Sequence, residues 1–165
     1  MQIRPERPEE AEAISALTTH AFATAPHADG TEAQIVEGLR AASALTLSLV
    51  ADEGGTLLGH VAVSPVQVDG HWGWQGLGPI SVLPERQGTG IGAALMHAAV
   101  EQLRASGAHG IVLVGDPAFY TRFGFRAAPG IALTGIPPEA ILALPFHEAM
   151  PEGALRFHVA FGLEY

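Results

Sequence analysis

Two stretches in the first half of the chain are rich in valine and leucine, and a third follows a turn signal; this pattern of apolar and polar positions predicts β-strands. The stretches are residues 45–51, 56–68 and 71–83. Asp52-Glu53-Gly54-Gly55 separates the first two, and Asp69-Gly70 separates the last two. Both are hairpin turn sequences, because glycine and aspartate tolerate a positive φ. The pattern therefore predicts three antiparallel strands, with Pro65 at a bulge or an edge because it lacks a backbone N–H.

A short strand and two amphipathic helices are predicted before these strands. Ile3-Arg4-Pro5 predicts the strand, which the proline ends. Residues 8–22 predict the first helix, because Pro8 suits a first helical turn and the glutamates after it complement the helix dipole. Thr31 starts the second helix, and Gln34 three residues later completes a capping box.

The second half of the chain begins with a glycine-rich turn and a long helix over residues 93–105, which Gly107 ends. A continuous apolar run from Gly110 to Gly115 is typical of a strand buried on both faces. Three further segments follow: a short helix over 117–123, a loop-and-helix region over 137–151 and a last strand over 156–163.

The resulting order is β-α-α-β-β-β-α-β-α-β-loop-β. Three antiparallel strands precede one parallel β-α-β crossover, which excludes a uniformly parallel, doubly wound sheet. A chain of 165 residues is long enough for one full hydrophobic core and too short for two of ordinary size. The sequence therefore predicts one mixed α/β domain over residues 1–165.

Composition excludes several classes of protein. The chain has no cysteine, which excludes disulfides, a thiolate nucleophile and cysteine-ligated metal. Its formal net charge is −9 and every basic residue is arginine, so its surface repels nucleic acid and anionic membranes. No apolar run approaches the roughly 18 residues of a membrane span, and the N-terminus has no visible secretory signal. We expect a cytoplasmic protein that binds neither nucleic acid nor membranes.

The segment from Val82 to Gly92 carries the most informative motif. It passes from an apolar strand, through a glycine-rich turn, into the helix over 93–105. The glycines leave consecutive backbone N–H groups bare at the positive end of a helix dipole. This arrangement binds phosphate and needs no basic side chain.

Two other interpretations of this turn remain open. Gly88-x-Gly90-x-x-Ala93 also fits the dinucleotide fingerprint, with Asp116 about 20 residues further on as the ribose-binding acid. Residues 84–87 intervene between the strand and the first glycine, and about half the chain precedes the motif, which argues against an NAD(P)-dependent oxidoreductase. The turn could also be a structural helix start that binds nothing.

Two motifs resemble the GNAT N-acetyltransferase superfamily, whose donor is acetyl-coenzyme A. Gln87-x-x-Gly90-x-Gly92 resembles its pyrophosphate-binding signature. Gly115-Asp116-Pro117-Ala118-Phe119-Tyr120-Thr121-Arg122-Phe123-Gly124-Phe125 resembles its second signature, a short helix that carries a tyrosine and ends in Gly-Phe. The commoner pattern has Asn and Ala before the tyrosine, and the variant here is similar to a bacterial branch of predicted acetyltransferases. The resemblance is strong over residues 77–125.

The resemblance implies a GNAT fold, in which helices flank a mixed, mostly antiparallel sheet and two strands splay apart around the coenzyme. It implies direct acetyl transfer from acetyl-CoA to a primary amine in a ternary complex, and the lack of cysteine excludes an acetyl-cysteine intermediate. Tyr120 would be the general acid that protonates the departing thiolate; the alternative is a core tyrosine whose hydroxyl bonds to the backbone. The implied coenzyme-binding residues are Ile80, Ser81, Val82, Arg86, Gln87, Gly88, Thr89, Gly90, Ile91 and Gly92.

The general base and the acceptor stay open. Glu37, His60, His71 or a water molecule could deprotonate the amine. The eight histidines show no close pair, so no metal site is expected. The pocket for a small-molecule or protein amine could be lined by residues 23–31 and by the region 137–151. The region 137–151 could instead be a lid or a homodimer contact. An acyl-CoA-binding module without turnover is the alternative function. The apolar side chains of 137–151 that look exposed are Ile141, Leu142, Leu144 and Phe146.

Overall fold

The computed structural model describes residues 1–26, 28–147 and 149–163. The chain divides into two compact units. The N-terminal unit comprises Met1–Val63 and Gly78–Ala99, and the C-terminal unit comprises Ser64–Leu77 and Val100–Tyr165. Two strands and one helix of the chain begin in one unit and end in the other. The single domain expected over residues 1–165 stays a prediction.

The N-terminal unit is built on three antiparallel strands in the order β1-β2-β3. They are β1 (Gln2–Pro5), β2 (Leu47–Glu53) and β3 (Thr56–Val68). Gly54 and Gly55 connect β2 to β3 with φ values of 60° and 92°. The hairpin predicted at this turn is therefore confirmed, because both positions need the conformational freedom of glycine.

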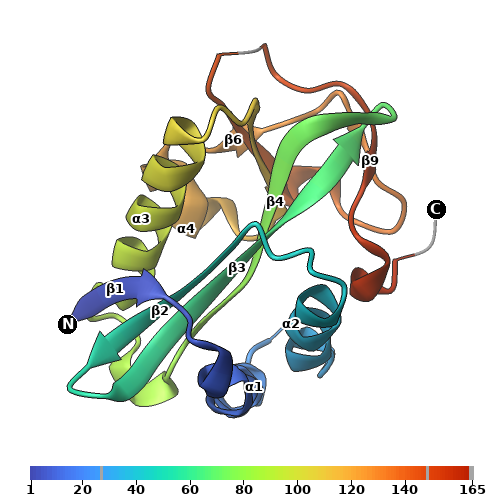
Figure 1. Ribbon diagram of the computed structural model, residues 1–165. Helices are drawn as coiled ribbons and strands as arrows, with labels where there is room; N and C mark the ends of the chain where they lie inside the picture. Colours follow the sequence, from blue (N-terminus) through green and yellow to red (C-terminus); the bar gives the residue numbers. More distant parts are fainter. Residues whose placement is uncertain (27, 148, 164–165) are drawn as a thin grey trace. The chain divides into compact units, whose positions relative to one another are not determined.

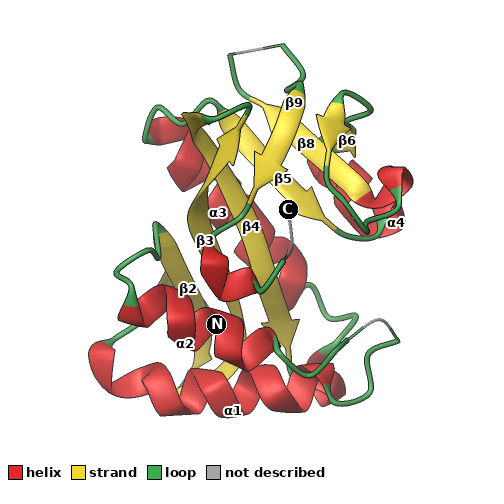
Figure 2. Cartoon of the chain, turned by 90° about the vertical axis from the view of Figure 1, so that its right-hand side faces the viewer, coloured by secondary structure: helices red, strands yellow, loops and turns green. Residues whose placement is uncertain are grey.

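Helices α1 (Ala11–Phe22) and α2 (Glu32–Ala41) pack against each other on one face of these strands (Figures 1 and 2). Ile14 and Val36 from the helices form a buried cluster with Val50 and Ala62 of the strands. A short 3-10 helix, η1 (Pro8–Glu10), leads into α1, as the proline predicts.

Helix α3 (Ile91–Ala105) begins in the same unit, on the opposite face of the strands (Figure 1). The two faces follow from strand alternation, because Gly59 and Ala62 are an odd number of residues apart in β3. A Cβ at Gly59 would lie 3.0 Å from both Ile91 Cγ2 and Leu95 Cδ1. Glycine at this position therefore lets the first turns of α3 lie directly on β3.

The capping box predicted at Thr31 is wrong, although α2 starts where it was expected. Thr31 caps nothing with its side chain. Its N–H and its hydroxyl both donate to Asp29 Oδ1, at 3.0 and 2.5 Å. Aspartate competes well for such local bonds, and here the Thr31 hydroxyl bonds to Asp29 and not to the helix N-terminus.

The C-terminal unit contains a sheet in the order β3-β4-β5-β8-β6 (Figure 2). Strands β4 (His71–Val82) and β5 (Gly110–Val114) are parallel, whereas β8 (Ile141–Pro145) is antiparallel to both β5 and β6 (Arg126–Ala127). The mixed α/β class predicted from the sequence is confirmed. The buried core of this unit includes Trp74, Val112, Leu155 and Phe157.

Strand β3 changes its partner along one edge within its length. Its pairing with β2 ends at Val63, and its pairing with β9 (Gly153–Arg156) starts at Gln67. Pro65 lies between these two ladders. The edge position predicted for it is confirmed, because neither ladder needs its missing N–H.

Two predictions for the last third of the chain are wrong. Residues 137–151, expected to be loop and helix, contain the 3-10 helix η4 (Pro138–Ala140) and then β8. Ile141 and Leu142 are 2% and 1% exposed, because β8 is an inner strand covered on both faces. The alternation over 156–163 produces no strand after Arg156, where β9 ends. Instead His158 caps the 3-10 helix η5 (Val159–Phe161) by accepting from the Ala160 N–H.

The remaining elements are one strand and three short helices. Strand β7 (Ile131–Ala132) pairs in parallel with β9. The helices are α4 (Pro117–Tyr120) and the 3-10 helices η2 (Pro84–Arg86) and η3 (Thr121–Phe123).

Within the described part of the chain, no helix is long and apolar enough to cross a membrane, and no three metal-ligating side chains form a cluster.

Candidate functional site

The glycine turn lies in the N-terminal unit, between η2 and the start of α3. Gly88 and Gly90 have φ values of 76° and 92°, which other residues rarely adopt. No side chain or backbone lies within 4 Å of a Cβ built at either position. Glycine is therefore present here for its backbone conformation and for an open surface, and not for close packing inside the protein.

A run of backbone N–H groups is left free by this turn. The Gln87 N–H donates to Pro84 O and the Ala94 N–H donates to Gly90 O, but among the described residues none accepts from the N–H groups of 88–93. Gly88, Thr89 and Gly90 are exposed. These groups lie where the positive end of the α3 dipole is, which is the arrangement that binds a phosphate or pyrophosphate.

Side chains beside the turn hold it in place and leave it free of basic charge. Gln87 Nε2 donates to Val82 O at 3.2 Å, and Thr89 Oγ1 donates to Arg86 O at 2.5 Å. The Arg86 guanidinium is paired with Glu53 at the end of β2. His20 Nε2 at the end of α1 lies 3.5 Å from Glu85 Oε2. An anion would therefore be held here chiefly by the backbone.

Strand β4 leads into this turn. Its registered pairs with β5 run from Trp74–Gly110 to Gly76–Val112. Gly78 then has a φ of 132°, and the Gly78–Pro79 peptide bond is cis. Ser81 is buried, and its hydroxyl has no partner among the described residues; Ile80 and Val82 are half-buried. That the amides of residues 80–82 bind the coenzyme stays a prediction.

The short helix α4 lies in the C-terminal unit and starts as the sequence predicts. Asp116 Oδ1 accepts from the Ala118 N–H at 2.9 Å, so Asp116 is an N-cap, and Pro117 occupies the first turn. Gly124 ends η3 in the left-handed conformation with a φ of 95°.

The ring of Tyr120 is fixed by close packing. A Cβ at Gly115 would lie 2.3 Å from Tyr120 Cε2, so only glycine fits beneath this ring. Phe119 and Phe125 contact the ring edge to face, at centroid distances of 4.9 and 6.0 Å. Within the described residues the Tyr120 hydroxyl makes no hydrogen bond, unlike a core tyrosine anchored to the backbone. Burial, with a smaller effect of the Asp116 charge, raises the pKa of Tyr120 to about 12, so the phenol keeps its proton at neutral pH.

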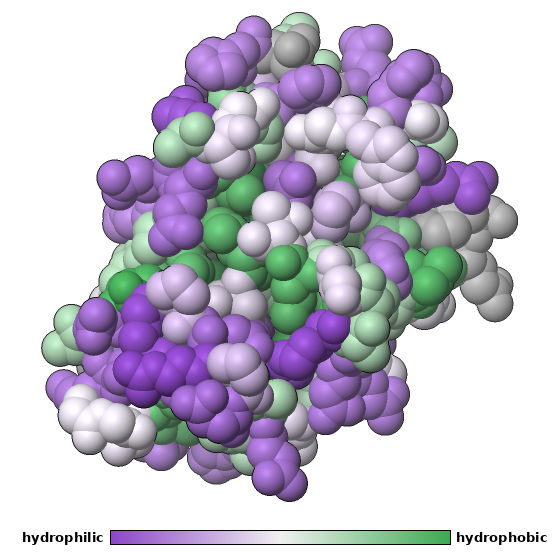
Figure 3. Space-filling model, in the orientation of Figure 1, coloured by the Kyte–Doolittle hydropathy of each residue, from purple (hydrophilic) through white to green (hydrophobic). Residues whose placement is uncertain are grey.

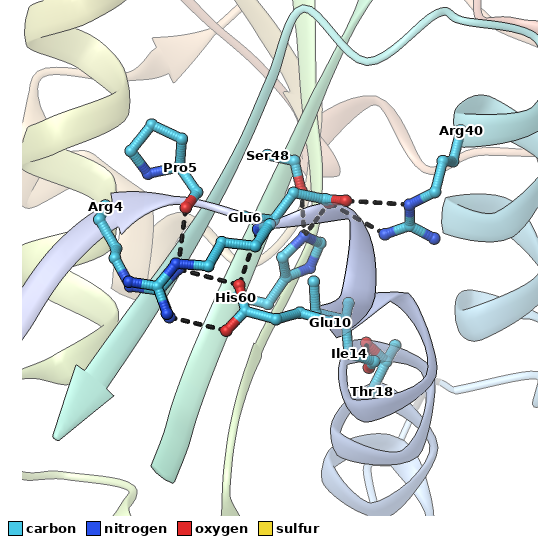
Figure 4. Close-up of polar contacts among 10 residues, drawn as sticks. Arg4, Pro5, Glu6, Glu10, Ile14, Thr18, Arg40, Ser48 and His60 are labelled. Carbon is cyan, nitrogen blue, oxygen red and sulfur yellow. Dashed lines mark hydrogen bonds and ion pairs between the residues drawn. The ribbon is translucent and has the colours of Figure 1, made fainter. Parts of the chain in front are cut away.

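A partly buried polar network, which the sequence did not reveal, lies between the strands and helices of the N-terminal unit (Figure 4). Glu6 accepts two bonds from the Arg40 guanidinium, at 3.0 and 2.9 Å, and a short bond from the Ser48 hydroxyl. His60 Nε2 lies 2.8 Å from Ser48 Oγ. Burial disfavours the Glu6 carboxylate, but the bonds from Arg40 and Ser48 outweigh it and lower the pKa of Glu6.

His60 is held in this network by its contact with Ser48, so its role there is structural. Its ring is fully buried, which lowers its pKa to about 4. As a candidate base His60 is therefore less suitable than an exposed group. Glu37 is exposed and accepts from the Ser15 hydroxyl at 2.8 Å, and His71 is exposed at the start of β4.

A small cavity of about 220 Å³ lies at the loop between α1 and α2. Phe22 and Glu32 line it, together with alanines of this loop. The loop belongs to the same unit as the glycine turn, and the His20–Glu85 contact brings the end of α1 beside that turn.

Comparison with known proteins identifies the family. A family model described as an acetyltransferase (GNAT) domain matches residues 45–127. The uncharacterized N-acetyltransferase YhbS of Escherichia coli (strain K12) is 39% identical over 130 residues, which cover 78% of this chain and 75% of that protein. The chain belongs to the GNAT acetyltransferase family.

Solved structures of GNAT proteins resemble the whole chain. A GNAT family acetyltransferase from Brucella melitensis, crystallised in complex with acetyl-CoA, is 47% identical, covers 97% of both chains and has a TM-score of 0.87. The crystal structure of Escherichia coli YhbS in complex with CoA is 32% identical, covers 98% of this chain and 91% of that one, and has a TM-score of 0.88. These comparisons confirm the family resemblance predicted from the two GNAT signatures. They also confirm the GNAT fold and the enzyme class, which is an N-acetyltransferase.

Proposed function

We propose that this GNAT protein transfers the acetyl group of acetyl-CoA to a primary amine by direct attack in a ternary complex. The observation that supports this most is the run of free N–H groups at residues 88–93, which suits the pyrophosphate of the coenzyme. The relatives solved with acetyl-CoA or CoA support the same donor. The acceptor would be a small molecule or a protein amine.

In this proposal residues 86–92 hold the pyrophosphate, and the amides of Ile80, Ser81 and Val82 hold the pantetheine arm and the thioester oxygen. The exposure of Gly88, Thr89 and Gly90 supports the first assignment, because the ligand can approach the backbone there. The open space around Gly88 and Gly90 supports it further, since a Cβ would narrow the anion site.

The chemical step has one bond made and one broken. The neutral amine nitrogen attacks the thioester carbonyl carbon and forms the amide C–N bond, and the C–S bond then breaks. Tyr120 gives its phenolic proton to the departing sulfur, while the amine loses a proton to a base or a water molecule. With a pKa of about 12 Tyr120 is protonated before the step, as an ordinary phenol also is, so the support for a free donor comes from its unbonded hydroxyl.

The cavity at the α1–α2 loop is the place we propose for part of the acceptor. Phe22 and the loop alanines offer an apolar wall, and the Glu32 carboxylate offers a partner for an amine. The net charge of −9 agrees with a cationic acceptor, because it attracts such molecules at long range.

Calorimetric titration with acetyl-CoA, with NADH titrated in parallel, tests the donor. We expect 1:1 binding of acetyl-CoA and none of NADH, followed by amine-dependent release of CoA thiol in a screen of amines. Binding of acetyl-CoA without turnover on any amine would favour an acyl-CoA-binding module, and binding of NADH alone would favour the dinucleotide interpretation.

Two glycine variants make the test specific to the turn. Gly90→Ala adds a Cβ where φ is 92°, and Gly107→Ala adds one where φ is 85° at the other end of α3; both positions are open. Both variants carry similar backbone strain, of about 1 kcal/mol. Only Gly90→Ala should weaken acetyl-CoA binding, and equal affinities in the two variants would contradict the proposed phosphate site.

Replacing Tyr120 with phenylalanine tests the general acid. The ring packing stays and only the hydroxyl is lost, so kcat should fall by about 10²–10⁴ while acetyl-CoA binds as before. An unchanged kcat would exclude Tyr120 as the proton donor.

A further inference from the structure

The C-terminal unit has a surface cavity of about 390 Å³ at the β3–β4 hairpin. This volume lies in the range of about 300–1,000 Å³ that is usual for small-molecule sites. Its walls are residues of the hairpin, the segment 149–152 and His109 just before β5. The residues that line this cavity all belong to the C-terminal unit, and only one of them, the candidate base His71, has been considered for the chemical step of acetyl transfer.

The lining of this cavity combines acidic and aromatic residues with two histidines, His71 and His109. Asp69 and Glu152 contribute two carboxylates, and no arginine is among the residues that line it. In the described part of the chain neither carboxylate forms an ion pair or a side-chain hydrogen bond. Trp72 and Trp74 contribute indole rings, and Trp72 is 63% exposed, which is unusual for the largest side chain.

Glycines lie directly against both acidic residues, and Gly153 also has a φ of 115°. A Cβ at Gly153 would lie 2.6 Å from Asp69 Cβ, and a Cβ at Gly130 would lie 2.7 Å from Glu152 Cγ. Asp69 itself has a φ of 52°, in the left-handed region that aspartate and asparagine tolerate. The hairpin tip around it is mostly hydrophilic or intermediate in hydropathy, at the upper right of Figure 3. The cavity is therefore a shaped, charged site and not an apolar groove.

We propose that this cavity binds an organic cation that carries primary ammonium groups on an aliphatic chain. An ammonium group would bond to the free carboxylates of Asp69 and Glu152, which no cation of the described residues neutralises. The exposed indole of Trp72 attracts the same charge through its ring face and can also pack against methylene groups, whereas Trp74 is only 6% exposed. An anion would meet two carboxylates here, and a neutral molecule would leave them unpaired.

Tryptophan fluorescence reports on this cavity directly, because the chain has two tryptophans and both line it. The probe is cadaverine, and the control ligand is 1,5-pentanediol, which has hydroxyls in place of the ammonium groups. We expect a saturable fluorescence change with cadaverine alone, weakened by about 0.5 M salt because exposed charge pairs are screened. No change with cadaverine, or an equal change with the diol, would overturn the proposal.

Matched variants assign the binding to the two carboxylates. Asp69→Asn keeps a residue that tolerates the left-handed backbone, and Glu152→Gln keeps the side-chain shape. Each should weaken cadaverine binding about three- to fivefold, and the double variant about tenfold or more. Glu101→Gln, which neutralises an exposed carboxylate of α3 in the same unit, is the control and should leave the affinity unchanged. Wild-type affinity in the double variant, or equal weakening by Glu101→Gln, would contradict the site.

Discussion

The His60 network predicts that acid destabilises the protein through one buried ring. The Ser48 hydroxyl donates to Glu6, so its oxygen can accept from the His60 Nε2–H. His60 Nδ1 is then an acceptor that faces no donor among the described residues. Protonating the ring would place the second proton on Nδ1, where it would be a buried charge without a hydrogen-bond acceptor. The low pKa of His60 agrees with this cost.

The magnitude follows from the pKa in the two states. Burial lowers the pKa of His60 from 6.5, the value expected for the unfolded chain, to about 4 in the folded protein. Between these values the unfolded chain binds more protons than the folded chain, so stability is complete above the unfolded pKa and falls as pH decreases. Linkage gives a loss of about 2 kcal/mol in the free energy of unfolding between pH 7 and pH 5.

Urea unfolding followed by circular dichroism at pH 7, 6 and 5 measures this loss. His60→Gln keeps an N–H for Ser48 and cannot be protonated, so its stability should fall by about 2 kcal/mol less than that of the wild type over this range. His20→Gln, at a histidine that is 59% exposed, is the control and should behave as the wild type. Glu10, whose pKa is lowered to about 2 chiefly by its bond from Arg4, loses its contribution at lower pH and does not interfere. Parallel pH dependence in the wild type and His60→Gln would refute the argument.

Three substitutions test local packing. Gly59→Ala places a Cβ 2.9 Å from the Ser81 carbonyl oxygen, so the free energy of unfolding should fall by about 1–3 kcal/mol in a denaturant titration; no change would mean that the β4 backbone at Ser81 can move aside. Gly115→Ala directs a Cβ against the Tyr120 ring, so kcat should fall while the calorimetric affinity for acetyl-CoA stays the same, and a loss of binding instead would assign Gly115 a wider role. Asp116→Ala removes the N-cap of α4 and should cost about 1 kcal/mol of stability, seen as a lower Tm; an unchanged Tm would show that the cap bond is replaced by water.

The sequence predicts best those elements whose cause is local. Positive φ at Gly54 and Gly55, and at Asp69 and Gly70, follows directly from the turn sequences, and both hairpins form there. The positive φ at Gly88 and Gly90 in the turn before α3 has the same local cause, while the anion site there stays a prediction.

The errors arise where a distant part of the chain decides. Strand β8 lies between prolines, and nothing local reveals that β5 offers it a buried, unpaired edge. The Glu6–Arg40–Ser48–His60 network joins the loop after β1 to α2, β2 and β3, so no spacing rule could find it. The capping error at Thr31 is local, but it depends on Asp29 accepting from the Thr31 N–H and hydroxyl, which the capping pattern does not consider.

The exchange of partners along β3 has a consequence for synthesis of the chain. The first ladder on β3 closes early, because β2 and β3 are neighbours in sequence, but Gln67 and Val68 pair with Arg156 and Leu155. On a ribosome this half of the strand therefore shows an open edge until nearly the whole polypeptide has been made. An exposed edge is where nascent chains associate with one another, so truncation before Gly153 should yield aggregates and not a shorter folded enzyme.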